Sequence, residues 1–201
     1  MTLPDLSALV SSRICHDLIS PVGAIGNGVE LLSSIPGGPG EELALISDSV
    51  STATQKLRCF RLAFGAAPAG ASVSAAETKT AVQSLFQGRY AANMSLQAGD
   101  PRRATVKALL LTILCQEKAL PLGGTSAIDL RRDGFQIDTA APKLREDRAL
   151  WALIDRPGLP ADLAAAEVQF PLLGQCLRDA GARLERHFED THIRLEVTGF
   201  A

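Results

Sequence analysis

Two helical segments at the start of the chain each carry a single apolar stripe, and a Pro- and Gly-rich break separates them. The first stripe recurs at helical spacing and comprises Ile14, Leu18, Val22, Ile25, Val29 and Leu32. The second advances in alternating steps of three and four, as in a coiled-coil seam, and comprises Leu43, Ile46, Val50, Ala53, Leu57, Phe60 and Phe64. Residues 33–40, SSIPGGPG, cannot continue a helix and are predicted to form the turn of a helical hairpin.

A helical hairpin with one apolar stripe on each helix must cover both stripes. Pairing of two hairpins into a four-helix bundle covers them, so the sequence predicts a homodimer. The alternative is a monomer in which the hairpin packs against the C-terminal part of its own chain.

The face of the first helix opposite its apolar stripe carries a histidine. On a helical wheel His16 lies about 200° from Ile14, so its imidazole is expected to face solvent. The same face carries small or polar residues that would let another protein approach the ring closely: Ser12, Ser20, Gly23 and Asn27. The alternative is a solvent-facing histidine without a role.

Residues 12–32, SRICHDLISPVGAIGNGVELL, resemble the H-box helix of two-component signalling proteins. In that helix a histidine followed by an acid and then by a Ser/Thr-Pro pair accepts phosphate. The segment CHDLISP is most similar to the ChpT-type histidine phosphotransferases of alphaproteobacteria. The resemblance of the chain to this family is strong over the first 64 residues and weaker over the rest. The resemblance implies that His16 is the phosphate carrier of a homodimer, with one His16 on each side.

Neighbours of His16 have candidate roles that the sequence leaves open. Asp17 either orients the imidazole through a ring N–H or is an exposed acid without a contact. Arg13, one turn earlier, either neutralises phosphate or is a solvated charge. Ser20 sits where kinase relatives carry a residue that positions water for dephosphorylation. Because they share the His16 face, Ser12, Gly23 and Asn27 are predicted to line the contact with a partner receiver domain.

The rest of the chain is predicted to form a second unit of mixed helices and strands, which makes the fold class α+β. The expected organisation is a hairpin domain over 1–64, a linker of small residues over 65–76, and an α/β sandwich over 77–201. The expected elements are helices over 78–87, 102–120, 143–154 and 164–180, an extended piece over 90–98, and hairpins over 126–137 and 183–197. Gly181 is the expected cap of the helix over 164–180, and Trp151 is expected in the core.

The order of elements in the second unit is similar to the ATP-binding domain of histidine kinases, but the residues that hold nucleotide differ. By spacing, Cys115 stands where those kinases have a magnesium-binding asparagine, and a soft thiol is a poor ligand for a hard cation. No Gly-x-Gly follows Gly124, so the lid that approaches the phosphates is missing. We therefore expect a degenerate ATPase-like domain that uses no ATP.

Without ATP, the phosphoryl group is expected to come from the receiver domain of a hybrid sensor kinase and to pass to the aspartate of response regulators. The resemblance further suggests cell-cycle regulators as recipients. The receiver would supply the Mg²⁺, so the chain itself is expected to need no cofactor. Two alternatives remain: a divergent histidine kinase that uses ATP, and a non-catalytic dimeric scaffold.

Composition excludes several other classes. A net charge of -2 without a basic cluster argues against nucleic acid or anionic lipid as a partner. There is no basic leader and no apolar run of about 20 residues, so we expect a cytoplasmic protein without a membrane partner. The four cysteines, 15, 59, 115 and 176, stand singly, which supports neither a zinc nor a redox site. His187 and His192 are read as surface residues, so no metal ligand is expected.

Overall fold

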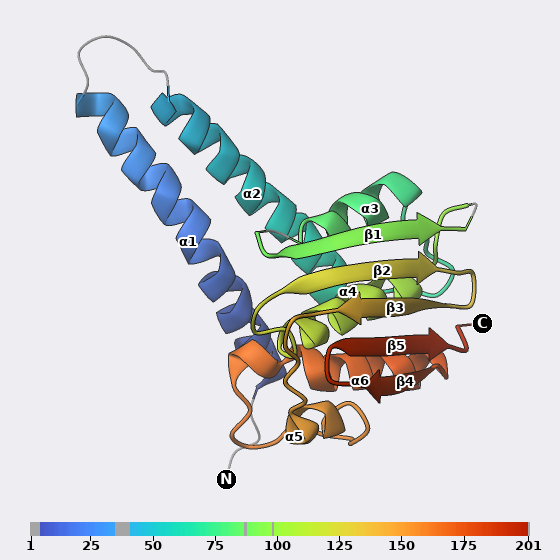
Figure 1. Cartoon of the computed structure of the whole chain (residues 1–201). Helices are drawn as coiled ribbons and strands as arrows, with labels where there is room; N and C mark the ends of the chain where they lie inside the picture. The colour runs from blue at the N-terminus through green and yellow to red at the C-terminus, as the bar shows by residue number, and fades with distance from the viewer. Residues whose placement is uncertain (1–4, 35–40, 87, 98, 201) are drawn as a thin grey trace.

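The computed structural model describes residues 5–34, 41–86, 88–97 and 99–200, which form a long helical hairpin joined to a two-layer α/β sandwich (Figure 1). The hairpin consists of α1 (Leu6–Ser34) and α2 (Glu41–Phe64). The sandwich contains α3 (Ala75–Gln83), β1 (Tyr90–Leu96), α4 (Arg103–Glu117), β2 (Gly124–Leu130), β3 (Gly134–Ala140), α5 (Arg148–Ala152), the 3₁₀ helix η1 (Ala165–Glu167), α6 (Gln169–Ala180), β4 (Arg183–Phe188) and β5 (His192–Thr198). The predicted α+β class, a helical hairpin followed by an α/β sandwich, is confirmed.

Helix α1 runs without interruption through Pro21 and ends at Ser34. Ser33 and Ser34 therefore belong to the helix, whereas the sequence placed them in the turn over 33–40. The remaining residues of that predicted turn, 35–40, lie outside the described residues. Among the described residues, no helix combines the length and the apolarity that a bilayer span requires.

The five strands form one sheet in the order β1-β2-β3-β5-β4. Strands β1 and β2 are parallel, and the other neighbouring pairs are antiparallel. Burial alternates along β2, β3 and β5, and the buried positions include Ile128, Ile137 and Leu195. One face of the sheet thus packs on α4 and α6, and the opposite face is open to solvent (Figure 1).

Helix α4 is the centre of the core. Twelve of its fifteen residues are buried, including a continuous run from Ala108 to Gln116. A helix that is apolar on nearly all sides must be covered on all sides. The sheet covers one side of α4, and α2 and α6 pack beside it.

The helices of the sandwich are shorter than the sequence predicted. Helix α3 begins at Ala75, three residues before the expected start and inside the expected 65–76 linker, because the Ser74 hydroxyl accepts from the Glu77 N–H at 3.1 Å and caps the helix there. The helix expected over 143–154 is reduced to the five residues of α5, because Asp147 caps it late by accepting from the Leu150 N–H.

The helix expected over 164–180 is divided into η1 and α6. Pro171 lies in the first turn of α6 and lacks the N–H that would extend the helical hydrogen bonds back to Glu167. Gly181 ends α6 in the left-handed conformation, with φ of 66°, as predicted. Trp151 is 4% exposed and packs edge-on against Phe170, which confirms its expected place in the core.

The last turns of α2 are part of the sandwich core. Three of their side chains are buried there: Cys59, Leu62 and Ala63. Two cations of α4 donate to the backbone where α2 ends: Arg103 Nη2 bonds the carbonyl of Arg61 and Lys107 Nζ bonds the carbonyl of Gly65, each at 2.9 Å. The Arg61 carbonyl also accepts from the Gly65 N–H at 3.1 Å, so Arg103 is its second donor, and both cations place positive charge at the negative end of α2.

We predict that Gly174→Ala destabilises the protein, because a Cβ at this position of α6 would lie 2.1 Å from the carbonyl oxygen of Ile154. Alanine favours a helix over glycine by about 1 kcal/mol, but overpacking against backbone typically costs roughly 1–3 kcal/mol. Urea unfolding should show a net loss of stability. Gly23→Ala is the matched control, since no atom lies within 4 Å of its Cβ, and it should be neutral or stabilising. Equal midpoints for the two variants would contradict the prediction.

Candidate functional site

His16 projects from α1 into solvent, with 86% of its side chain exposed. The residues predicted to share its face are exposed as well: Ser12, Ser20, Gly23 and Asn27. A Cβ built at Gly23 has no neighbouring atom within 4 Å, so the surface two turns beyond His16 is unobstructed. A folded domain can therefore approach the imidazole along this face of α1.

Asp17 contacts the ring of His16 at Nδ1. Its Oδ1 lies 3.1 Å from His16 Nδ1. A carboxylate can only accept, so in the neutral ring Nδ1 carries the proton and donates to Asp17, which leaves the lone pair on Nε2. The arrangement orients the imidazole and leaves Nε2 as the ring nitrogen that can act as a nucleophile.

Arg13 is engaged with protein groups and is not a solvated charge. Its side chain is 12% exposed, its Nε donates to Asp17 Oδ2 at 2.7 Å, and its Nη1 donates to the carbonyl of Ala166 at 3.1 Å. The sequence left two interpretations of Arg13 open, a cation that neutralises phosphate and a solvated charge. The structure instead joins this guanidinium to the acid that orients His16 and to η1 of the sandwich.

Pro21 removes one backbone hydrogen bond of α1, at the residue next to His16. It has no N–H to donate to the carbonyl four residues earlier, which is that of Asp17. The ammonium group of Lys56 on α2 lies 3.4 Å from this carbonyl and donates to it. Lys56 was not found from the sequence: Pro21 indicated that the Asp17 carbonyl needs another donor, but nothing local indicated which residue supplies it.

The positions that the sequence compared with the nucleotide-binding residues of histidine kinases are explained here by burial and backbone packing. Cys115 is fully buried, and burial raises the pKa of its thiol well above the usual value. Gly123 has φ of +82° and lies against the backbone of Arg89, and a Cβ at Gly124 would lie 2.8 Å from the carbonyl of Ala140. Close approach of backbone to backbone explains both glycines, as expected of a turn that leads into a strand.

Groups of His, Cys, Asp and Glu that could hold a metal ion do not occur among the described residues. His187 is exposed on β4, and His192 Nε2 lies 3.7 Å from Asp138 Oδ1. Asp138 is also bonded by Arg194 at 2.6 Å. Arg194 and Asp138 therefore form an ion pair on the open face of the sheet, with His192 beside it.

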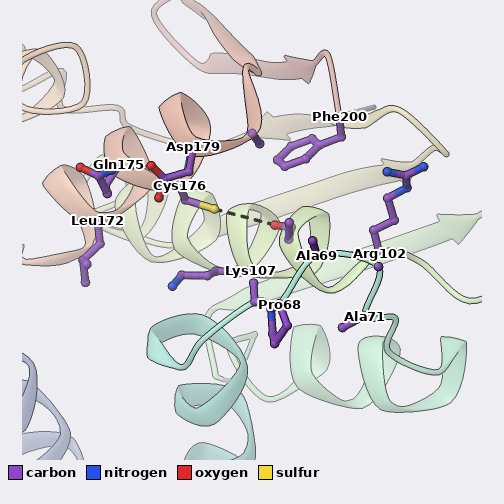
Figure 2. Close-up of a pocket in the computed structure, with 14 residues that line it drawn as sticks. Pro68, Ala69, Ala71, Arg102, Lys107, Leu172, Gln175, Cys176, Asp179 and Phe200 are labelled. Carbon is purple, nitrogen blue, oxygen red and sulfur yellow. Dashed lines mark hydrogen bonds between the residues drawn. The ribbon is translucent and has the colours of Figure 1, made fainter.

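A cavity of about 430 Å³ lies between residues 67–71, α4, α6 and Phe200. The Cys176 thiol donates to the carbonyl of Ala104 at 3.8 Å. A dashed line from Cys176 marks this contact in Figure 2. Burial raises the pKa of the Cys176 thiol. The residues that line this cavity include none from α1, so it is separate from the face around His16. No sequence signal marked it, because residues 67–71 read only as part of a linker.

A family model, a sequence relative and a solved structure each match this chain to phosphotransferases. The family model described as histidine phosphotransferase C-terminal domain matches residues 75–192. Protein phosphotransferase ChpT of Brucella abortus (strain 2308) is 40% identical over 134 residues, which are 63% of this chain and 61% of that protein, so the alignment spans less than two thirds of its length. A solved structure described as that of a bacterial phosphotransferase is 30% identical with a TM-score of 0.78, and the match covers 98% of both chains.

Proposed function

The chain belongs to the histidine phosphotransferase family, and from this premise we propose that it carries phosphoryl groups on His16 between the receiver domains of a phosphorelay. The observation that carries the proposal is the state of the His16 ring. It is 86% exposed, and Asp17 holds Nδ1, which leaves Nε2 free for chemistry.

The reaction needs only these groups from the chain. The lone pair of His16 Nε2 attacks the phosphorus of an aspartyl phosphate, the bond between phosphorus and the aspartate oxygen breaks, and the carboxylate leaves. The resulting phosphoimidazolium keeps its proton on Nδ1, where the charge of Asp17 stabilises it. Transfer onward reverses these steps on the aspartate of a second receiver, and each receiver supplies the Mg²⁺ that neutralises its own oxygens.

The receiver of a hybrid sensor kinase is the proposed donor, and response regulators are the proposed acceptors. The open, small-residue face of Ser12, Ser20, Gly23 and Asn27 supports docking of such a domain around His16. From the resemblance to ChpT-type phosphotransferases we further propose that these regulators act in cell-cycle control, and we propose that the protein works in the cytoplasm. ATP is not a proposed substrate, since the buried Cys115 replaces a magnesium ligand and no Gly-x-Gly follows Gly124.

A homodimer is the proposed working form. Large apolar side chains on the hairpin remain roughly half exposed or more: Ile19, Val22, Val29, Leu31, Leu43, Leu45, Val50 and Leu57. This set includes members of both apolar stripes, so contact between α1 and α2 of one chain leaves part of each stripe open. A second hairpin would cover them in a four-helix bundle.

The first prediction of this proposal concerns the source of phosphate. Full-length protein is mixed either with receiver domains labelled at the aspartyl phosphate with ³²P or with γ-³²P-ATP, and His16→Ala is run beside the wild type. We expect acid-labile label from the receiver only, and none in the variant. Label taken directly from ATP would instead make the chain a kinase. No label in either arm would contradict the proposal and favour a scaffold.

A second prediction concerns assembly. Sedimentation of the wild type should give twice the chain mass of 21.2 kDa. Val50→Asp places a charge on the proposed interface and should shift the protein toward monomer. Leu122→Asp is the matched control, since Leu122 is 54% exposed on a sandwich loop, and it should stay dimeric. A monomeric wild type, or equal effects of the two variants, would refute the dimer.

A third prediction concerns receiver docking. Gly23→Leu places a bulky group on the His16 face and should slow transfer from a phosphorylated receiver by about tenfold or more, because a displacement of about 1 Å disrupts in-line attack. Gly23→Ala adds one methyl group and should transfer at nearly the wild-type rate. Both variants should keep the dimer and the unfolding midpoint, since Gly23 lies off the apolar stripe. Unchanged kinetics of Gly23→Leu would place the contact elsewhere.

A further inference from the structure

The carboxylate of Asp17 is divided between two partners. Oδ1 lies 3.1 Å from His16 Nδ1, and Oδ2 accepts from Arg13 Nε at 2.7 Å. Side chains of adjacent helical residues point about 100° apart, so the Asp17 carboxylate must take a particular rotamer to reach the ring of its neighbour. The Arg13 bond selects that rotamer, because it is made by the opposite oxygen.

Arg13 is itself fixed from outside α1. An exposed ion pair four residues apart on a helix would contribute only about 0.3–0.5 kcal/mol and would leave both side chains mobile. Here the guanidinium spans two elements, since Nη1 donates to the Ala166 carbonyl of η1 at 3.1 Å. Arginine suits this task because its planar fork holds two acceptors in a fixed relation. Figure 1 shows the N-terminal half of α1 beside the orange segment that precedes α6.

The Ala166 carbonyl is anchored to the sandwich by a second donor. Gln169 Nε2 bonds it at 3.0 Å and also lies 3.4 Å from the carbonyl of Leu114 on α4. Gln169 is 1% exposed, so its amide is fixed within the core. A continuous series of hydrogen bonds therefore runs from α4 through Gln169, the Ala166 carbonyl, Arg13 and Asp17 to the ring of His16.

We propose that Arg13 is a positioning residue through which the sandwich, by way of the Ala166 carbonyl, holds Asp17 against His16 and keeps Nε2 unprotonated. The ATPase-like unit thereby contributes to the chemistry without nucleotide, because it holds in place the acid that sets the His16 tautomer. The inference rests on the proposed function for its kinetic consequence, but its structural consequence concerns the unphosphorylated protein alone.

The test measures the tautomer of His16 in full-length protein labelled with ¹⁵N-histidine. Long-range ¹H–¹⁵N spectra are recorded at a pH where the ring is neutral, and His16→Ala assigns the signals among the three histidines. We expect the Nδ1–H form in the wild type and a shift toward Nε2–H in Arg13→Met, with Arg13→Lys in between. Arg148→Met is the control, because Arg148 is 87% exposed on α5 and should leave the signals unchanged.

Kinetics supply the second measurement. Arg13→Met should lower the kcat for transfer from a phosphorylated receiver roughly tenfold, as expected for loss of one orienting hydrogen bond, with little change in KM. A rise in KM with unchanged kcat would mean that Arg13 binds the receiver, and would overturn the proposal. If the tautomer shifts as expected but His16 never takes up label, the positioning role of Arg13 is supported and the proposed phosphocarrier function is refuted.

Gln169→Met tests whether the hydrogen bonds that position Arg13 depend on the sandwich. It should shift the His16 tautomer in the same direction as Arg13→Met, and the double variant should shift it no further than Arg13→Met alone. An additive double variant, or a folded Gln169→Met with a wild-type tautomer, would show that Arg13 acts within α1 only. An unchanged tautomer in Arg13→Met would refute the proposal even if Gln169→Met does not fold.

Discussion

Burial of the last turns of α2 against α4 is the contact on which the rest of the architecture depends. Cys59, Leu62 and Ala63 lie in the same core as α4, α6 and the sheet, and two cations of α4 donate to the carbonyls at the end of α2. The hairpin is therefore an extension of the sandwich and not a loosely tethered arm. Because α1 packs along α2, the position of His16 relative to the sandwich is fixed by the same core.

The site around His16 combines exposure with constraint. The ring itself faces solvent, but the groups around it are held in place: the Asp17 carboxylate by Arg13 of the same helix, the Asp17 carbonyl by Lys56 of α2, and Arg13 by η1. Pro21 contributes by leaving the Asp17 carbonyl open to Lys56. A phosphocarrier requires this combination, because its histidine must be reachable by several partners and yet present one ring nitrogen to all of them.

Much of this was predictable from local pattern. Helical periodicity placed His16 opposite the apolar stripe, alternation in the C-terminal half predicted the hairpins that became β2–β3 and β4–β5, and Gly181 marked the end of α6. The bonds from Arg13 to the Ala166 carbonyl and from Lys56 to the Asp17 carbonyl were not predictable, because each joins residues far apart in the chain, and hydrophobic periodicity contains no information about such pairs. The predicted helix bounds were wrong at three helices. Caps at Ser74 and Asp147 set the starts of α3 and α5, and the missing N–H of Pro171 separates η1 from α6.

In the proposed mechanism Asp17 occupies Nδ1 of His16 and leaves Nε2 to carry the phosphoryl group. Its most direct test is to phosphorylate ¹⁵N-histidine-labelled protein and to determine, from phosphorus–nitrogen coupling and the ring ¹⁵N shifts, which atom is bonded to phosphorus. We expect a single phosphohistidine at position 16 with phosphorus on Nε2. Phosphorus on Nδ1 of His16, or on any other residue, would contradict it.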